Sequence, residues 1–375
     1  MNSIPVVVLA GFLGSGKTTV LNHLLGNRGG TRIGVVVNDF GSIEVDAMAV
    51  AGQVGDSMVS LGGGCLCCAV DGSELDAYLE KLADPVHRID VIVIEASGLA
   101  EPQEMVRMLV ANENPGVRYG GMVQIVDAAE FDATRARHPE TDRHLAVADL
   151  VVLNKTDRID AAERTRIEGA LAALCAPGIP VVGADHGRID PELLFDRRPW
   201  TETRGQLSFE DLLAQAHDHD RDHDGDEHAD HVHAAYESTE FVSEQALGPR
   251  RFIEFLDRRP AGLYRIKGSV YFGVPGHEER YEVHAVGRFL RFAPHPWGRG
   301  EPRLTQLVLI GSGTDGPALL RELEDCREPE PWHAAPESMW GVLRYVHRPA
   351  EQAPDPDPES DPDPDPDDHP DPEDY

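Results

Sequence analysis

The sequence predicts an α/β protein, in which a largely parallel sheet is followed by a smaller α+β unit. Three observations favour this fold class. Short apolar runs alternate with helical patterns over the first half of the chain, a Gly-rich segment directly follows the first run, and the order of elements changes after a His-rich segment. Continuous apolar runs are typical of strands that are covered on both faces.

The first half alternates expected strands with expected helices. The predicted strands are Ile4–Leu9, Ile33–Val37, Val91–Ile94, Met122–Val126, Leu150–Leu153 and Ile179–Val182. The predicted helices are Thr18–Leu25, Ser73–Leu82, Glu101–Val110 and Ala161–Leu174. Such a series forms βαβ units, whose ligands bind beyond the carboxyl ends of the strands.

The second unit runs from Tyr236 to about Cys326 and has a different order of elements. It starts with a strand and places two helices around several further strands. The predicted helices are Pro249–Leu256 and Gly316–Cys326, and the further strands are Tyr264–Phe272, Tyr281–Val286, Gly287–Phe292 and Leu307–Ile310. This order indicates a small α+β domain.

Two low-complexity segments set the domain boundaries. Residues His217–His233 contain six histidines and seven acidic residues, and a Pro-Asp tail begins at about Pro354. Neither composition buries enough apolar surface to offset the loss of chain entropy on ordering. We therefore expect a first domain over residues 1–200, a disordered linker over 201–235, a C-terminal domain over 236–330, and a tail over 331–375 that is disordered from about residue 354.

Composition excludes several classes of protein. The net charge of −32 argues against a nucleic-acid partner, because phosphate binding requires a basic surface. No stretch approaches the roughly 20 apolar residues that a membrane span requires, and no targeting signal is present at the N-terminus. Neighbouring cysteines such as Cys67 and Cys68 rarely reach disulfide geometry. We expect a soluble, cytoplasmic protein with reduced thiols and no membrane partner.

The Gly-rich segment Gly11–Thr18 (GFLGSGKT) matches the phosphate-binding loop pattern G-x-x-x-x-G-K-[ST]. In this pattern the backbone N–H groups face the phosphates, Lys17 reaches the β and γ oxygens, and the Thr18 hydroxyl can bind Mg²⁺. The alternative is a plain Gly-rich turn between strand and helix. The predicted nucleotide contacts here are Gly11, Gly14, Ser15, Gly16, Lys17, Thr18 and Thr19, with Lys17 and Thr18 also in catalytic roles.

The sequence Asn154-Lys155-Thr156-Asp157 closes another apolar strand and matches N-K-x-D, the guanine-binding motif of GTPases. Asp157 would accept hydrogen bonds from the ring N–H and the exocyclic amine of guanine, a pair of donors that adenine lacks. A helix-capping turn is the alternative. The motif predicts base contacts by Asn154, Lys155 and Asp157.

Glu95 and Gly98 follow the strand between these two motifs. Glu95 places a carboxylate at the edge of the sheet, where it would bind Mg²⁺ directly or through a water, and would take part in catalysis. A surface charge at a strand end is the alternative. Gly98 stands where a nucleotide-dependent switch must move.

Three thiols follow a Gly-rich turn at Cys65, Cys67 and Cys68. Thiolates are preferred ligands of Zn²⁺ and Cu⁺, so this C-x-C-C segment predicts a transition-metal site, most simply a zinc site. Three thiolates leave a tetrahedral site one ligand short, and Asp39, a histidine or a partner could supply the fourth. Buried core thiols and a redox switch are the alternatives.

The other candidate metal ligands carry less information. The histidines of the linker would form a weak, multi-site metal reservoir, or the segment is a solvated linker only. Cys175 and Cys326 each end an apolar helical pattern and have no nearby ligand in the sequence, so we expect both to pack in a core.

Together these motifs resemble the CobW-type GTPases, which are related to the nickel-insertion GTPases of hydrogenase and urease maturation. The resemblance covers roughly residues 4–326. It is carried by GFLGSGKT, the NDFG segment at 38–41, GGCLCC at 63–68, EASGLAEP at 95–102, NKTD at 154–157, and LYRIKG at 263–268 with Pro296-Trp297. Many members have Glu where Asp39 stands, which leaves open whether Asp39 is a ligand.

The resemblance implies a P-loop GTPase domain, slow intrinsic GTP hydrolysis, and nucleotide-dependent delivery of a metal from C-x-C-C. It implies GTP or GDP, Mg²⁺ and Zn²⁺ as ligands, with Co²⁺ or Fe²⁺ as alternatives, and a client metalloprotein as partner. A zinc store or buffer, and a cobalt-handling factor of cobalamin synthesis, are the competing functions. The oligomeric state is not predicted.

Overall fold

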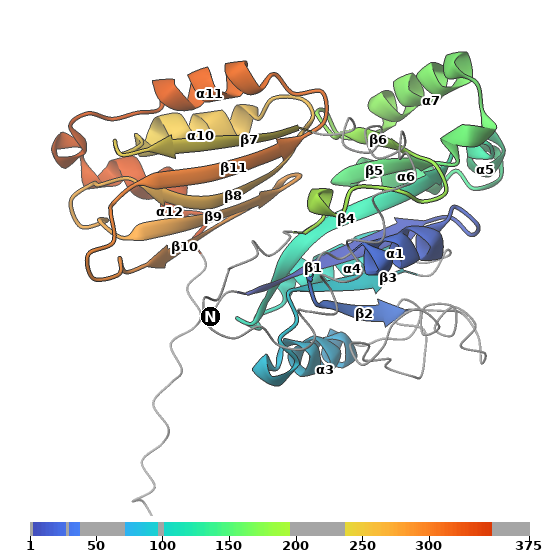
Figure 1. The fold of residues 1–375 in the computed structure, drawn as a ribbon, viewed down its shortest axis with the longest axis horizontal. Coiled ribbons are helices and arrows are strands. Elements are labelled where there is room, and N and C mark those ends of the chain that lie inside the picture. Colours follow the sequence, from blue (N-terminus) through green and yellow to red (C-terminus); the bar gives the residue numbers. More distant parts are fainter. Residues whose placement is uncertain (1–2, 28–29, 38–71, 97–100, 196–236, 347–375) are drawn as a thin grey trace, which may run out of the picture.

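The computed structural model describes residues 3–27, 30–37, 72–96, 101–195 and 237–346. Two sheets dominate these residues, a six-stranded sheet from the first half of the chain and a five-stranded sheet from the second (Figure 1). The expected linker at 201–235 and the Pro-Asp tail from 354 lie outside the described residues. No helix of the described part is long and apolar enough to cross a membrane.

All strand pairs of the first sheet are parallel, in the order β2-β3-β1-β4-β5-β6. The strands are β1 (Ile4–Gly11), β2 (Ile33–Val37), β3 (Val91–Glu95), β4 (Val117–Asp127), β5 (Leu150–Asn154) and β6 (Val181–Ala184). Their helices are α1 (Lys17–Gly26), α3 (Gly72–Ala83), α4 (Pro102–Ala111), α5 (Phe131–Arg137), α6 (Thr141–Ala146) and α7 (Ala161–Leu174). The predicted α/β class with a parallel sheet is therefore confirmed.

Both faces of this sheet are covered, as its continuous apolar strands require. Because side chains alternate along a strand, Val7 and Leu9 of β1 pack in one core with α1, whereas Val6 and Val8 pack on the other face with α3 and α4. A third cluster under β5 contains α5, α6 and α7. The parallel arrangement places the carboxyl ends of β1, β3, β4 and β5 at one edge.

The second sheet is antiparallel, in the order β10-β9-β8-β11-β7. Its strands are β7 (Glu237–Ser243), β8 (Leu263–Tyr271), β9 (Arg280–Val286), β10 (Phe289–His295) and β11 (Thr305–Gly311), and its helices are α10 (Pro249–Arg258), α11 (Gly316–Asp325) and α12 (Trp340–Leu343). Helices α10 and α11 cover one face of this sheet (Figure 1). The smaller α+β unit is confirmed.

The other face of the antiparallel sheet packs against the parallel one. Tyr264 of β8 and Val286 of β9 join the α1-side core of the first sheet, and Gly121 of β4 lies close to both. His284 Nε2 donates a hydrogen bond to the carbonyl of Tyr119 at 3.0 Å. The two units therefore share a buried interface.

Two expectations need correction. Residues 331–346, which we expected to begin the tail, pack on the second core, because Met339 and Val342 are fully buried there. Gly287, which we expected in a strand, forms the turn between β9 and β10 with a φ of 51°. The short helices α5 and α6 were not predicted.

Candidate functional site

The phosphate-binding pattern forms the loop between β1 and α1. Gly16 precedes α1 with a φ of 101°, and a side chain there would meet the Asn154 amide, so only glycine suits this position. The Lys17 ammonium, on a residue that is 7% exposed, donates to the carbonyls of Gly11 at 3.1 Å and Phe12 at 3.4 Å. These two bonds hold the positive charge beside the loop and the N-terminus of α1, where an anion is stabilised.

Thr18 and Glu95 meet at the same edge, although 77 residues separate them. The Thr18 hydroxyl donates to Glu95 Oε1 at 2.8 Å, and Glu95 is 4% exposed. A buried carboxylate is costly unless a cation or hydrogen bonds compensate its charge. Two hard oxygen atoms in contact beside the phosphate loop are the donor set that Mg²⁺ prefers, so these residues fit the predicted ion.

Asn154, at the end of β5, connects the phosphate loop to the loop after β6. Its Nδ2 donates to the Ser15 carbonyl at 2.9 Å, and its Oδ1 accepts from the Gly187 N–H at 2.9 Å. With 1% exposure, this side chain is enclosed between the two loops. It determines where the two loops stand relative to each other.

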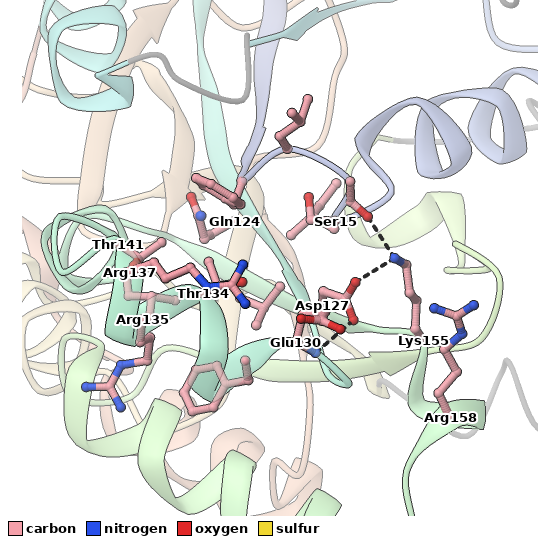
Figure 2. Close-up of a pocket in the computed structure, with 17 residues that line it drawn as sticks. Ser15, Gln124, Asp127, Glu130, Thr134, Arg135, Arg137, Thr141, Lys155 and Arg158 are labelled. Carbon is pink, nitrogen blue, oxygen red and sulfur yellow. Dashed lines mark hydrogen bonds and ion pairs between the residues drawn. The ribbon is translucent and has the colours of Figure 1, made fainter.

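Lys155 makes a second connection to the phosphate loop. Its ammonium donates to the Gly14 carbonyl at 2.7 Å and pairs with Asp127 Oδ2 at 2.5 Å (Figure 2). Asp127 ends β4, and its other oxygen accepts from the Ala129 N–H at 3.0 Å. Asp127 was not predicted from the sequence, and its position at the carboxyl end of a strand was the available signal.

Asp157 lies at the open side of this edge. Its Oδ2 is 3.7 Å from His186 Nε2, and both side chains reach solvent. Thr156 donates to the carbonyl of Ala184 at 3.2 Å, which ties the N-K-x-D turn to the loop after β6. A planar base bound by Asp157 would therefore be bordered by residues 184–187, a loop that the sequence did not indicate.

The structure brings together the predicted residues of the phosphate loop, Glu95 and the N-K-x-D motif at one sheet edge. Thr19 follows on α1 and is exposed. Asp39, Cys65, Cys67, Cys68 and Gly98 lie outside the described residues. Among the described residues no group of His, Cys, Asp and Glu has the arrangement of a metal site. Cys175 and Cys326 are both buried, and burial raises the pKa of each thiol to about 11.

The parallel sheet, the phosphate loop after its first strand, and the N-K-x-D turn after its fifth define a P-loop GTPase. The model of the CobW/HypB/UreG nucleotide-binding domain matches residues 5–181, and that of the cobalamin synthesis protein CobW C-terminal domain matches residues 236–327. The chain belongs to the CobW family of GTPases.

Relatives of known name extend over most of the chain. It is 31% identical to a zinc chaperone CobW of Sinorhizobium sp. over 82% of this chain and 92% of that protein. It is 32% identical to the zinc chaperone CobW of Pseudomonas aeruginosa over 85% and 90%. A crystal structure of the Zn(II)-bound YjiA GTPase from Escherichia coli aligns over 88% and 100% at 23% identity, with a TM-score of 0.40.

Proposed function

We propose that this GTPase is a zinc metallochaperone that uses Mg²⁺ and GTP to control zinc at Cys65, Cys67 and Cys68. Relatives that align over most of their length are named zinc chaperones. The C-x-C-C segment offers the thiolates that zinc prefers. A client metalloprotein would receive the metal, and GTP hydrolysis would set the direction of transfer.

The observation that carries the coupling is the register of β2 and β3. Val37, the last residue of β2, pairs with Glu95, whose carboxylate accepts the Thr18 hydrogen bond. Asp39 follows Val37 by two residues, which span at most about 7 Å of chain. We therefore expect a change at the γ-phosphate side of the site to act on the segment that contains Asp39 and the cysteines.

The chemical step is in-line attack of water on the γ-phosphate of GTP. Lys17 and the loop N–H groups stabilise the charge that develops on the phosphate oxygens, and Thr18 with Glu95 would hold Mg²⁺. When bound, Mg²⁺ neutralises the β and γ oxygens. As in the CobW-type GTPases that the sequence resembles, we expect slow turnover without a partner.

Asp157 would select guanine. Lys155 would lie along the plane of the base, and residues 184–187 would lie beside the base. The Asp157 carboxylate would accept both donors of the guanine edge, and a base without them would leave the carboxylate unpaired. The loop beside the base and the phosphate loop would therefore be connected through Asn154, which bonds to Gly187 in the first and to Ser15 in the second.

Zinc titrations in the presence of GDP and of a non-hydrolysable GTP analogue test the proposal. We expect one tight zinc site whose affinity differs between the two nucleotides, and reciprocal changes in nucleotide affinity. Cys67→Ser should lose tight zinc binding but retain GTP binding. Cys326→Ser is the matched control, because its hydroxyl can keep the contact with the Glu322 carbonyl.

Two results would contradict parts of this proposal. A protein with serine at all three positions 65, 67 and 68 that still binds one zinc tightly would place the site elsewhere. Equal zinc affinity with both nucleotides would favour a zinc store or buffer. Competition with Co²⁺ and Fe²⁺ in the same titrations would identify a different cargo metal.

A further inference from the structure

A cavity of about 330 Å³ lies beside the phosphate loop, between that loop, the end of β4 and helices α5 and α6 (Figure 2). Its lining includes Phe12, Leu13, Gly14 and Ser15 but none of Lys17, Thr18, Glu95 or Asp157. It therefore shares Gly14, Ser15 and Lys155 with the predicted nucleotide site but excludes the residues predicted to carry the phosphate charge, the metal and the guanine contact. Its size falls in the range of about 300–1,000 Å³ that is typical of small-molecule sites.

Two residues that line this cavity each have a buried side-chain oxygen without a hydrogen-bond partner among the described residues. Gln124 and Ser15 are each 2% exposed, and neither Gln124 Oε1 nor Ser15 Oγ is bonded to any described residue. Buried polar groups are almost always paired, because leaving one unpaired costs the full desolvation of that group. Both residues line the same cavity, and a ligand there would pair with these atoms if the side chains turn toward it.

The charges around the cavity favour an anion. Arg135 is paired with Asp142 through two bonds of 2.7 and 2.8 Å, and Lys155 is paired with Asp127. Arg137 and Arg158 line the same cavity and make no ion pair within the described part of the chain. Against these two cations stands a single unpaired carboxylate of the lining, Glu130.

The remaining surface of the cavity is apolar. Phe12 and Leu13 on the loop face Phe131 and Leu145 on the helices, and Ile125 belongs to β4 between them. Phe12 is also held against the His138 ring, with 4.3 Å between ring centroids. An inorganic anion would pair with the arginines but would leave this apolar surface exposed to water.

We propose that this cavity binds a small organic anion, with an apolar body and a hydrogen-bond donor, that regulates nucleotide affinity. The anionic group pairs with Arg137, the donor reaches Gln124 Oε1, and the apolar body packs on Phe12 and Phe131. Such a ligand contacts the loop at Phe12, Leu13, Gly14 and Ser15. The proposal does not depend on zinc binding and remains testable if the thiols prove to have another role.

The geometry also gives the path of regulation. Gly14 and Ser15 belong to both the cavity wall and the phosphate loop, and their carbonyls accept from Lys155 and Asn154 of the N-K-x-D motif. A ligand that holds this wall in place keeps the loop in the arrangement that accepts phosphates. We therefore expect it to strengthen GDP binding, and GDP to strengthen its binding by the same factor.

Binding of 3-hydroxybenzoate and 4-hydroxybenzoate to the full chain, measured by NMR and calorimetry, tests the site. Benzoate lacks the donor, phenol lacks the charge, and inorganic phosphate lacks the apolar body. We expect one hydroxybenzoate to bind at a single saturable site, more tightly than all three. Arg137→Gln should weaken it about tenfold, and Gln124→Leu should remove its advantage over benzoate.

Arg107→Gln is the matched control, since Arg107 is an exposed arginine of α4 that pairs with Glu104 away from the cavity. Saturation with the bound probe should raise GDP affinity about fivefold. The proposal is overturned if neither hydroxybenzoate binds saturably, if Arg137→Gln leaves the affinity unchanged, or if the probe competes with GDP. Unchanged GDP affinity at saturation would remove its regulatory role. Because Arg137 is exposed, its variant tests the site without disturbing the core.

Discussion

The nucleotide edge of the parallel sheet and the interface between the two sheets both bury charged side chains. The groups that compensate these buried charges differ between the two regions. At the nucleotide edge, Lys17 and Glu95 lie beside a loop whose N–H groups are arranged for an anion. At the interface, the buried Asp149 carboxylate is compensated by hydrogen bonds from other residues of the protein. Asp149 Oδ2 accepts from the Met122 N–H at 2.9 Å and from the Tyr119 hydroxyl.

This difference separates residues that serve ligand binding from residues that serve stability. A bound nucleotide would add to the internal hydrogen bonds of the charges at the nucleotide edge, so changes there should alter binding more than folding. The interface has no such ligand among its bonds. Changes there should lower the free energy of unfolding and leave GTP affinity nearly unchanged.

The largest effect is expected for Lys17→Ala. Removing the ammonium leaves the β and γ phosphates without their point charge, and nucleotide affinity should fall at least about 100-fold. Fluorescent GDP binding measures it, with Lys81→Ala, an exposed lysine of α3, as control. Wild-type affinity in the Lys17 variant would show that this loop does not hold the phosphates.

Asp157→Asn should change which base is bound. The amide loses one acceptor for the guanine donors, so GTP affinity should fall about 100-fold while ATP affinity stays low. The amide also supplies a donor for the second carbonyl of xanthine, so XTP should gain affinity. Competition of GTP, XTP and ATP for one labelled nucleotide decides the matter, and an unchanged order of preference would mean that N-K-x-D is only a turn.

Tyr119→Phe tests the interface side of the comparison. It removes the hydroxyl that donates to Asp149, a carboxyl whose pKa is raised by burial, and should cost about 1–3 kcal/mol of stability. Urea unfolding measures this loss, and GTP binding of the folded variant should match the wild type. Weakened GTP binding at equal stability would mean that the interface acts on the nucleotide site.

The smallest effect is a pH dependence from His284. Burial lowers the pKa of His284 well below its usual value, so the native state binds this proton less readily than the unfolded chain. Stability should therefore be full above pH of about 6.5 and fall below it by at most about 1.4 kcal/mol per pH unit. The free energy of unfolding of the wild type and of His284→Gln, measured between pH 7.5 and 5.5, isolates this contribution. Parallel plots of that free energy against pH would contradict it.

The sequence predicted the parallel sheet well, because its strands are continuous apolar runs and its loops carry motifs of fixed spacing. Short helices such as α5, with 7 residues, contain too few turns to produce a clear period. The packing of residues 331–346 was not predicted, because their apolar run Met339–Leu343 is too short to show a period and follows a segment rich in proline and glutamate.

Within the site, the sequence indicated the residues that belong to a motif. It did not indicate the residues that hold those motif residues in place. Lys155 belongs to a recognisable pattern, whereas its partner Asp127 is one acidic residue among 66 and is identified only by its place at the end of β4. The interface contact of His284 with Tyr119 joins positions 165 residues apart. No local pattern records a pairing of that kind, because only the packing of the two sheets creates it.

Asn154 has a consequence for the genetics of this protein. One amide fixes both Ser15, in the loop for phosphates, and Gly187, in the loop beside the base. Substitutions in these two loops should therefore be epistatic rather than additive, since each changes the position that the shared amide imposes on the other. A loss-of-function allele at Asn154 would then show the defects of both loops at once. A genetic screen would group this allele with mutations of the phosphate loop or with mutations of the loop at Gly187.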